Sequence, residues 1–107
     1  MYLGEQNDGE FFDSYGEPPP KIFKRFLDKH CPNWIFNTTK LQSLISKFCG
    51  HYCVFYCLFK FLNYELSAIL DCFIDDATVN DWLAHSLCVT LFRNIVLFKL
   101  EHWDLII

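Results

Sequence analysis

Three side chains in this sequence are of the types that could carry out acyl transfer together: Cys49, Gln42 and Asp13. Cys49 opens an apolar stretch that we expect to be a helix, and the free N–H groups and partial positive charge of a helix start stabilise a thiolate. Gly50 adds no side-chain bulk beside the sulfur. A thiolate is the nucleophile that acyl transfer by cysteine requires. A cysteine at such a position also commonly has no chemical role.

The other two side chains are of the types that assist such a thiol. Gln42 precedes Cys49 by seven residues, and its side-chain N–H could donate to an oxyanion beside the backbone N–H of Cys49. Asp13 ends an aromatic segment, and its carboxylate could orient a histidine imidazole. Each also has an ordinary interpretation, Gln42 as a polar loop residue and Asp13 as a turn-forming residue before Ser14 and Gly16.

The elements that must position these residues follow from turn signals and periodicity. Asp8-Gly9 indicates a hairpin turn, three prolines precede an amphipathic stretch, and Cys31-Pro32 ends that stretch. The expected elements are strands ending at 2–3 and beginning at 10–13, a helix over 21–30, a strand over 33–37, a loop over 38–48, and helices over 49–63, from 67 to 73 and from 81 to about 97.

The helix over 49–63 is almost wholly apolar, so we expect it to be central and buried. Cys49, Cys53 and Cys57 are spaced four apart and would line one stripe of it, and free cysteine is among the most buried residue types. Thr78 or Asn80 is the expected cap of the last helix.

Composition excludes some functions. The net charge is −4 and the basic residues are scattered, which argues against a nucleic-acid surface. No apolar run is long enough to span a membrane, and the polar, acidic residues 1–9 do not resemble a secretory leader. Six cysteines then indicate free thiols in a reducing compartment, the cytoplasm or nucleus. Apolar residues make up 52% of the chain, so we also expect exposed apolar surface that could bind a partner protein.

The ordered set of motifs resembles one family. The segments that carry the resemblance are Phe-Phe-Asp-Ser-Tyr-Gly at 11–16, Leu-Gln at 41–42 and Ser-Lys-Phe-Cys-Gly-His-Tyr-Cys at 46–53. They resemble the adenovirus-type cysteine endopeptidases, most closely those of Maverick/Polinton transposons, within a wider clan that includes the ubiquitin-like-protein proteases. The resemblance covers roughly residues 2–85. It implies a papain-like α+β fold, in which a small sheet packs on a buried central helix, and hydrolysis of a polypeptide substrate.

The resemblance assigns Cys49 as nucleophile, Gln42 as oxyanion donor and Asp13 as the residue that orients the catalytic histidine. In that family the histidine lies in a His-Trp strand about seventeen residues before the acidic residue, which here falls before Met1. The resemblance therefore implies a domain that is incomplete at its N-terminus. Glu-His-Trp at 101–103 resembles that His-Trp strand in a different place, so His102 could substitute for the missing histidine.

The remaining histidines have structural interpretations. His51 would point away from Cys49, because residues two apart on a helix do not face each other. His30 would lie at a helix C-terminus, and His85 within a helix. Zinc held by the cysteine stripe is disfavoured, since structural zinc sites draw ligand pairs from separate turns.

The sequence thus predicts that residues 1–97 are the C-terminal part of a cysteine peptidase domain and that 98–107 are an unassigned tail. We expect no cofactor and no metal. Because the histidine is absent, the chain should be inactive or nearly so. Two alternatives stay open: a non-catalytic, transposon-derived remnant that binds a partner protein, and a small membrane-associated protein.

Overall fold

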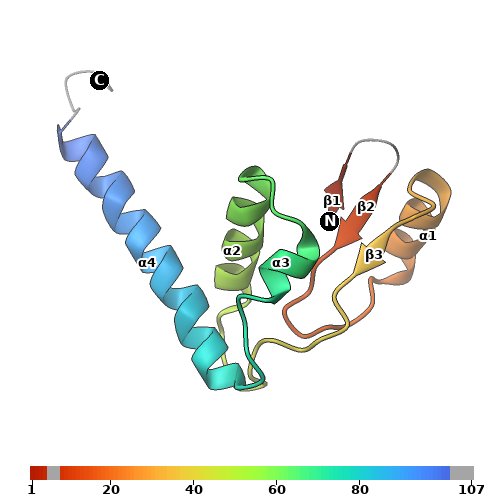
Figure 1. Ribbon diagram of the computed structural model, residues 1–107, viewed down its shortest axis with the longest axis horizontal. Helices are drawn as coiled ribbons and strands as arrows, with labels where there is room; N and C mark the ends of the chain where they lie inside the picture. The colour runs from red at the N-terminus through yellow and green to blue at the C-terminus, as the bar shows by residue number, and fades with distance from the viewer. Residues whose placement is uncertain (5–7, 102–107) are drawn as a thin grey trace.

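The protein is described by a computed structural model over residues 1–4 and 8–101 (Figure 1). It is a small α+β structure with a three-stranded sheet and four helices in this part of the chain. The strands are β1 (Tyr2–Leu3), β2 (Gly9–Phe11) and β3 (Ile35–Phe36). The helices are α1 (Lys21–His30), α2 (Cys49–Phe61), α3 (Leu66–Leu70) and α4 (Ala77–Glu101).

β2 is the central strand of the sheet. It pairs antiparallel with β1, with Glu10 opposite Tyr2, and parallel with β3, with Glu10 also opposite Ile35. The connection between the parallel strands contains α1, as parallel pairing requires a crossover. The expected hairpin is confirmed, but Gly9 is a strand residue paired with Leu3 and is not part of the turn.

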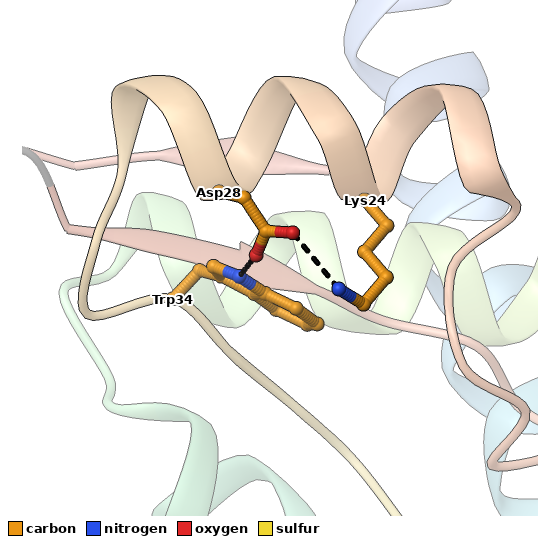
Figure 2. Close-up of polar contacts among 3 residues, drawn as sticks. All are labelled: Lys24, Asp28 and Trp34. Atoms are coloured by element: carbon orange, nitrogen blue, oxygen red, sulfur yellow. Dashed lines mark hydrogen bonds and ion pairs between the residues drawn. The ribbon is translucent and has the colours of Figure 1, made fainter.

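Helix α1 has the bounds predicted from the sequence, because the prolines before it and Cys31-Pro32 after it leave little choice of limits. It packs on β2 through Leu27 and Cys31, which a Cβ on Gly9 would meet at 2.9–3.0 Å. Asp28 connects α1 to the segment before β3 by accepting a hydrogen bond from Trp34 Nε1 at 2.8 Å (Figure 2). Within α1, the same carboxylate accepts from Lys24 Nζ at 2.8 Å.

The main core lies around α2. Tyr52, Phe55 and Tyr56 form its buried face. They pack with residues of the preceding loop, α3, the segment after α3 and the start of α4: Leu41, Leu66, Ile69, Phe73 and Ala84. Tyr56 stacks on Phe12 at 4.7 Å between ring centres, which joins this core to the chain just after β2.

A partly buried ion pair also joins α2 to the sheet. Lys60 Nζ lies 2.9 Å from Glu10 Oε2, and the Tyr56 hydroxyl donates to Glu10 Oε1 at 2.8 Å. The Lys60 ammonium also lies 4.5 Å from the centre of the Tyr2 ring. One carboxylate of β2 is therefore bound twice by α2, close to β1.

The expectation that α2 is buried throughout was wrong. Cys49, Cys53 and Cys57 are exposed, as are Val54 and Phe61. An almost uniformly apolar helix has no polar face to indicate which side meets the core, so contacts elsewhere in the chain decide it. Here the tyrosine and phenylalanine side chains take the core and the cysteine stripe faces outward.

The predicted start of the last helix was also wrong. Neither Thr78 nor Asn80 caps α4; instead Asp76 Oδ1 accepts from the backbone N–H groups of Thr78 and Val79, at 3.0 and 3.3 Å. The helix therefore begins at Ala77, four residues before the predicted start. It continues without a break through the expected boundary at 97/98 as far as Glu101.

Helix α4 packs against α2 along its first half, and its second half extends away from the rest of the structure (Figure 1). Phe92 is 70% exposed on that second half, and Val89 and Ile95 are exposed beside it. Among the described residues, no helix is both long and apolar enough to cross a membrane.

Candidate functional site

Cys49 is exposed at the first residue of α2. Phe48, the N-cap residue, makes no side-chain capping hydrogen bond to this helix. A Cβ added to Gly50 would meet nothing within 4 Å. The sulfur is therefore open to an approaching ligand and lies at the positive end of a helix.

Tyr15 is the hydrogen-bond partner that the structure gives to this sulfur. The Cys49 thiol lies 3.8 Å from the Tyr15 hydroxyl, an exposed contact across 34 positions of sequence. This hydrogen bond with Cys49 is the largest cause of a raised pKa for Tyr15, with partial desolvation second. The phenol is thus held neutral beside the thiol.

Asp13 lies in the turn that positions Tyr15. Its carboxylate accepts from the backbone N–H of Tyr15 at 3.2 Å and of Glu17 at 3.3 Å. Its own backbone N–H donates to Oδ1 of buried Asn37 at 2.9 Å, just after β3. This is the turn-forming role that sequence reasoning gave as the ordinary interpretation. The described residues place no histidine against this carboxylate.

Gly16 completes that turn with a left-handed backbone, φ +71°. Its N–H donates to the Asp13 carbonyl at 2.8 Å. A Cβ at this position would lie 2.9 Å from the carbonyl oxygen of Thr38, so only glycine fits without strain. The Asp13–Tyr15 turn is therefore held tightly against the segment after β3.

Gln42 is fully buried and connects the turn that contains Asp13 with the loop that leads to Cys49. Its Oε1 accepts from the Ser14 hydroxyl at 2.5 Å, and its Nε2 donates to the Ser46 carbonyl at 3.2 Å and the Ser46 hydroxyl at 2.8 Å. Both amide hydrogens are thereby engaged. To donate to an oxyanion at Cys49, this side chain would have to release Ser46.

The backbone reinforces this connection. The N–H groups of Leu41 and Gln42 both donate to the Ser14 carbonyl, at 2.8 and 3.0 Å. Asp81, buried on α4, accepts from the Tyr52 hydroxyl at 2.7 Å and from the backbone N–H of Ser43 at 3.3 Å. The loop that leads to Cys49 is therefore fastened to the Asp13 turn on one side and to α4 on the other.

Burial and the Asp81 carboxylate both change the pKa of Tyr52. Desolvation, followed by its hydrogen bond to Asp81, raises the pKa of Tyr52 far above its usual value. The phenol is therefore a hydrogen-bond donor to Asp81 at neutral pH. Asn80 completes the contact by donating to the Leu41 carbonyl at 3.2 Å and to the Ile74 carbonyl at 2.7 Å.

The described histidines lie elsewhere. No histidine nitrogen within residues 8–101 is hydrogen-bonded to the Cys49 sulfur. His51 faces His85 across α2 and α4, with Nε2 and Nδ1 3.4 Å apart, so its predicted orientation away from Cys49 agrees with its contacts. His30 lies in the last turn of α1 and packs on Phe26, 4.5 Å between ring centres. His102 lies outside the described residues.

The structure therefore brings the three predicted residues into one region through Ser14, Tyr15 and Ser46. Sequence reasoning did not single out Tyr15 as a partner of the thiol, although Tyr15 lies within the motif at 11–16. It also gave no role to Ser14 or Ser46. Gln42 pairs with Ser14 across 28 positions, and no local pattern indicates which polar side chains meet over such a separation. Ser46 is only four residues from Gln42, so this contact is local and was missed because the loop has no regular period.

Comparison of the chain with protein-family models, with curated proteins and with solved structures found no match in any of the three. The papain-like architecture and the peptidase family are therefore predictions from the sequence motifs. The α+β arrangement and the contacts described above come from the structure itself.

Proposed function

We propose that this chain carries the nucleophile of a cysteine-type peptidase, with Cys49 attacking the carbonyl of a polypeptide substrate. The observation that carries the proposal is the exposed Cys49 thiol at the uncapped start of α2, beside open space at Gly50. Helix N-termini favour thiolates, and access without side-chain bulk is what an extended peptide needs. The resemblance of the motifs at 11–16, 41–42 and 46–53 supports the same assignment.

The supporting residues have defined parts in this proposal. The Cys49 backbone N–H and the Gln42 amide hold the oxyanion, Gln42 exchanging Ser46 for the substrate. Asp13 orients a histidine supplied from outside the described residues. Without that base, proton transfer from the thiol and to the leaving amine loses its usual acceleration of about 10²–10⁴-fold. The chain alone is therefore inactive or nearly so.

An activated peptidyl ester tests this proposal, because its leaving group needs no proton. The Cys49 sulfur displaces p-nitrophenolate and forms a thioester, and water later releases the acid. We expect a burst of one equivalent followed by slow turnover, which added imidazole accelerates as a substitute base. The burst should vanish in Cys49→Ala and persist in Cys72→Ala, the matched exposed cysteine. A burst that survives Cys49→Ala contradicts the proposal.

A second candidate is a partner-binding remnant without catalysis. The observation that favours it is the apolar surface between α2 and the second half of α4. A groove of about 540 Å³ lies there, lined by Cys53, Val54, Cys57, Leu58, Phe61 and Leu91. Phe61, one of these lining residues, is 82% exposed. Apolar patches of this kind commonly mark interaction sites.

Substitution separates the two candidates. Phe61→Ser on α2 should weaken capture of a partner and leave acylation of Cys49 unchanged, whereas Cys49→Ala should do the reverse.

The six cysteines are all unpaired, which supports a location in a reducing compartment, the cytoplasm or the nucleus.

A further inference from the structure

His51 of α2 and His85 of α4 form a pair outside the site described above. Their facing nitrogens, His51 Nε2 and His85 Nδ1, are 3.4 Å apart, and their ring centres are 5.2 Å apart. Both side chains are half-buried. Two imidazoles from different helices therefore present nitrogens to each other at a helix crossing.

Aromatic side chains hold both rings in place. Phe48 stacks on His85, 5.1 Å between centres and 20° between planes, and meets His51 edge-on at 4.9 Å. Trp82 packs edge-on against His85 at 5.7 Å. Two rings fixed in this way lose little rotamer freedom when they bind a common ligand.

The spacing matches a tetrahedral metal site. With Zn–N bonds of about 2.05 Å, two ligand nitrogens lie about 3.3 Å apart, and their ring centres, about 1.15 Å beyond each nitrogen, about 5.2 Å apart. The structure gives 3.4 Å and 5.2 Å for these quantities.

We propose that His51 and His85 bind a divalent transition-metal ion such as zinc. Within the described residues, no three histidine, cysteine or acidic side chains are grouped to hold a metal. The pair therefore supplies two ligands, and water or an exogenous ligand takes the other positions. Imidazole nitrogen is a preferred ligand for zinc, copper and nickel.

Zinc titration followed by the ring resonances of the histidines in nuclear magnetic resonance tests the proposal on the unmodified chain. The His51 and His85 rings should shift together with one saturation curve, and His30, on α1, should not shift with them. Free thiols are zinc ligands as well, so the titration is judged on the imidazole signals. Shifts confined to cysteine resonances, with both rings unmoved, overturn the proposal.

Substitution provides the second measurement. His85→Gln keeps much of the ring's volume, and it should weaken the zinc-induced shift of His51 at least about tenfold in affinity. His51→Gln should do the same to His85, whereas His30→Gln should leave both unchanged. A His51 shift that survives His85→Gln with unaltered affinity also overturns the proposal.

Discussion

Replacement of Gln42 by alanine should destabilise the protein strongly, because this side chain joins two loops from a fully buried position. The substitution removes three hydrogen bonds, one from Ser14 and two to Ser46. At about 0.5–1.5 kcal/mol each, with buried partners left unpaired, we expect a loss of about 2–4 kcal/mol in the free energy of unfolding. For a domain of this size the melting temperature should fall by at least about 8 °C.

Thermal unfolding followed by circular dichroism measures this loss. Thr39→Ala is the matched control, since Thr39 is exposed in the same loop, and it should shift the melting temperature by less than about 3 °C. Gln42→Glu tests the hydrogen bonds separately from the lost volume. Its carboxylate has no N–H to donate to Ser46 and is buried, so it should also destabilise. If both Gln42 variants melted like Thr39→Ala, the structural role assigned to Gln42 would be refuted.

Three other perturbations have defined outcomes. Lys60→Ala removes the partner of Glu10 in an ion pair where the Lys60 side chain is only 12% exposed, and it should lower the free energy of unfolding in urea by about 2–3 kcal/mol. Lys24→Ala is the control, because the Lys24 side chain is 56% exposed, and it should cost less than about 1 kcal/mol. Equal losses would contradict this prediction. Gly16→Ala should lower the free energy of unfolding by about 1–2 kcal/mol or more, because Gly16 has a left-handed backbone. Gly50→Ala should raise it by about 0.5 kcal/mol, because a Cβ in this helix would meet open space. Equal melting temperatures for the two variants would contradict this prediction. Hydrogen bonds from Lys24, the larger cause, and from an indole N–H lower the pKa of Asp28. The contribution of Asp28 to stability is therefore complete above the unfolded pKa of about 4 and is lost as the pH falls through the lower folded value. Tryptophan fluorescence across pH 2–5 should show a transition that Asp28→Asn removes, and a transition unchanged by this substitution would count against the prediction.

Some of the fold could be predicted because short-range signals were strong. The proline run, Cys31-Pro32 and the Asp8-Gly9 turn signal each restrict the backbone locally, and α1 and the hairpin follow directly from them. The start of α2 at Cys49 was likewise predicted, from an almost wholly apolar stretch that follows a loop.

Other features depend on long-range contacts. The burial of Tyr52 rather than Cys53 depends on which side of α2 meets α4 and α3, and a uniformly apolar helix does not encode that choice locally. The start of α4 was misjudged because Asp76 competes with Thr78 and Asn80 for the capping position. Asn80 is instead used in buried contacts with Leu41 and Ile74.

The candidate site was predictable in its members and less so in their contacts. Cys49 lies at a helix start, as predicted, but its exposure was not predicted, and Asp13 and Gln42 lie in the same region. The structure gives Asp13 a turn and Gln42 a buried pairing with Ser46. The catalytic roles of all three residues remain predictions.

The measurement that tests the central claim most directly is labelling of the whole chain with a thiol-directed peptidyl electrophile at neutral pH, followed by peptide mapping. Cys49 and Cys72 are both exposed, but only Cys49 lies at a helix N-terminus beside open space. The account predicts that Cys49 reacts at least about tenfold faster than Cys72. Equal rates at the two cysteines, or faster labelling of Cys53 and Cys57, would contradict it.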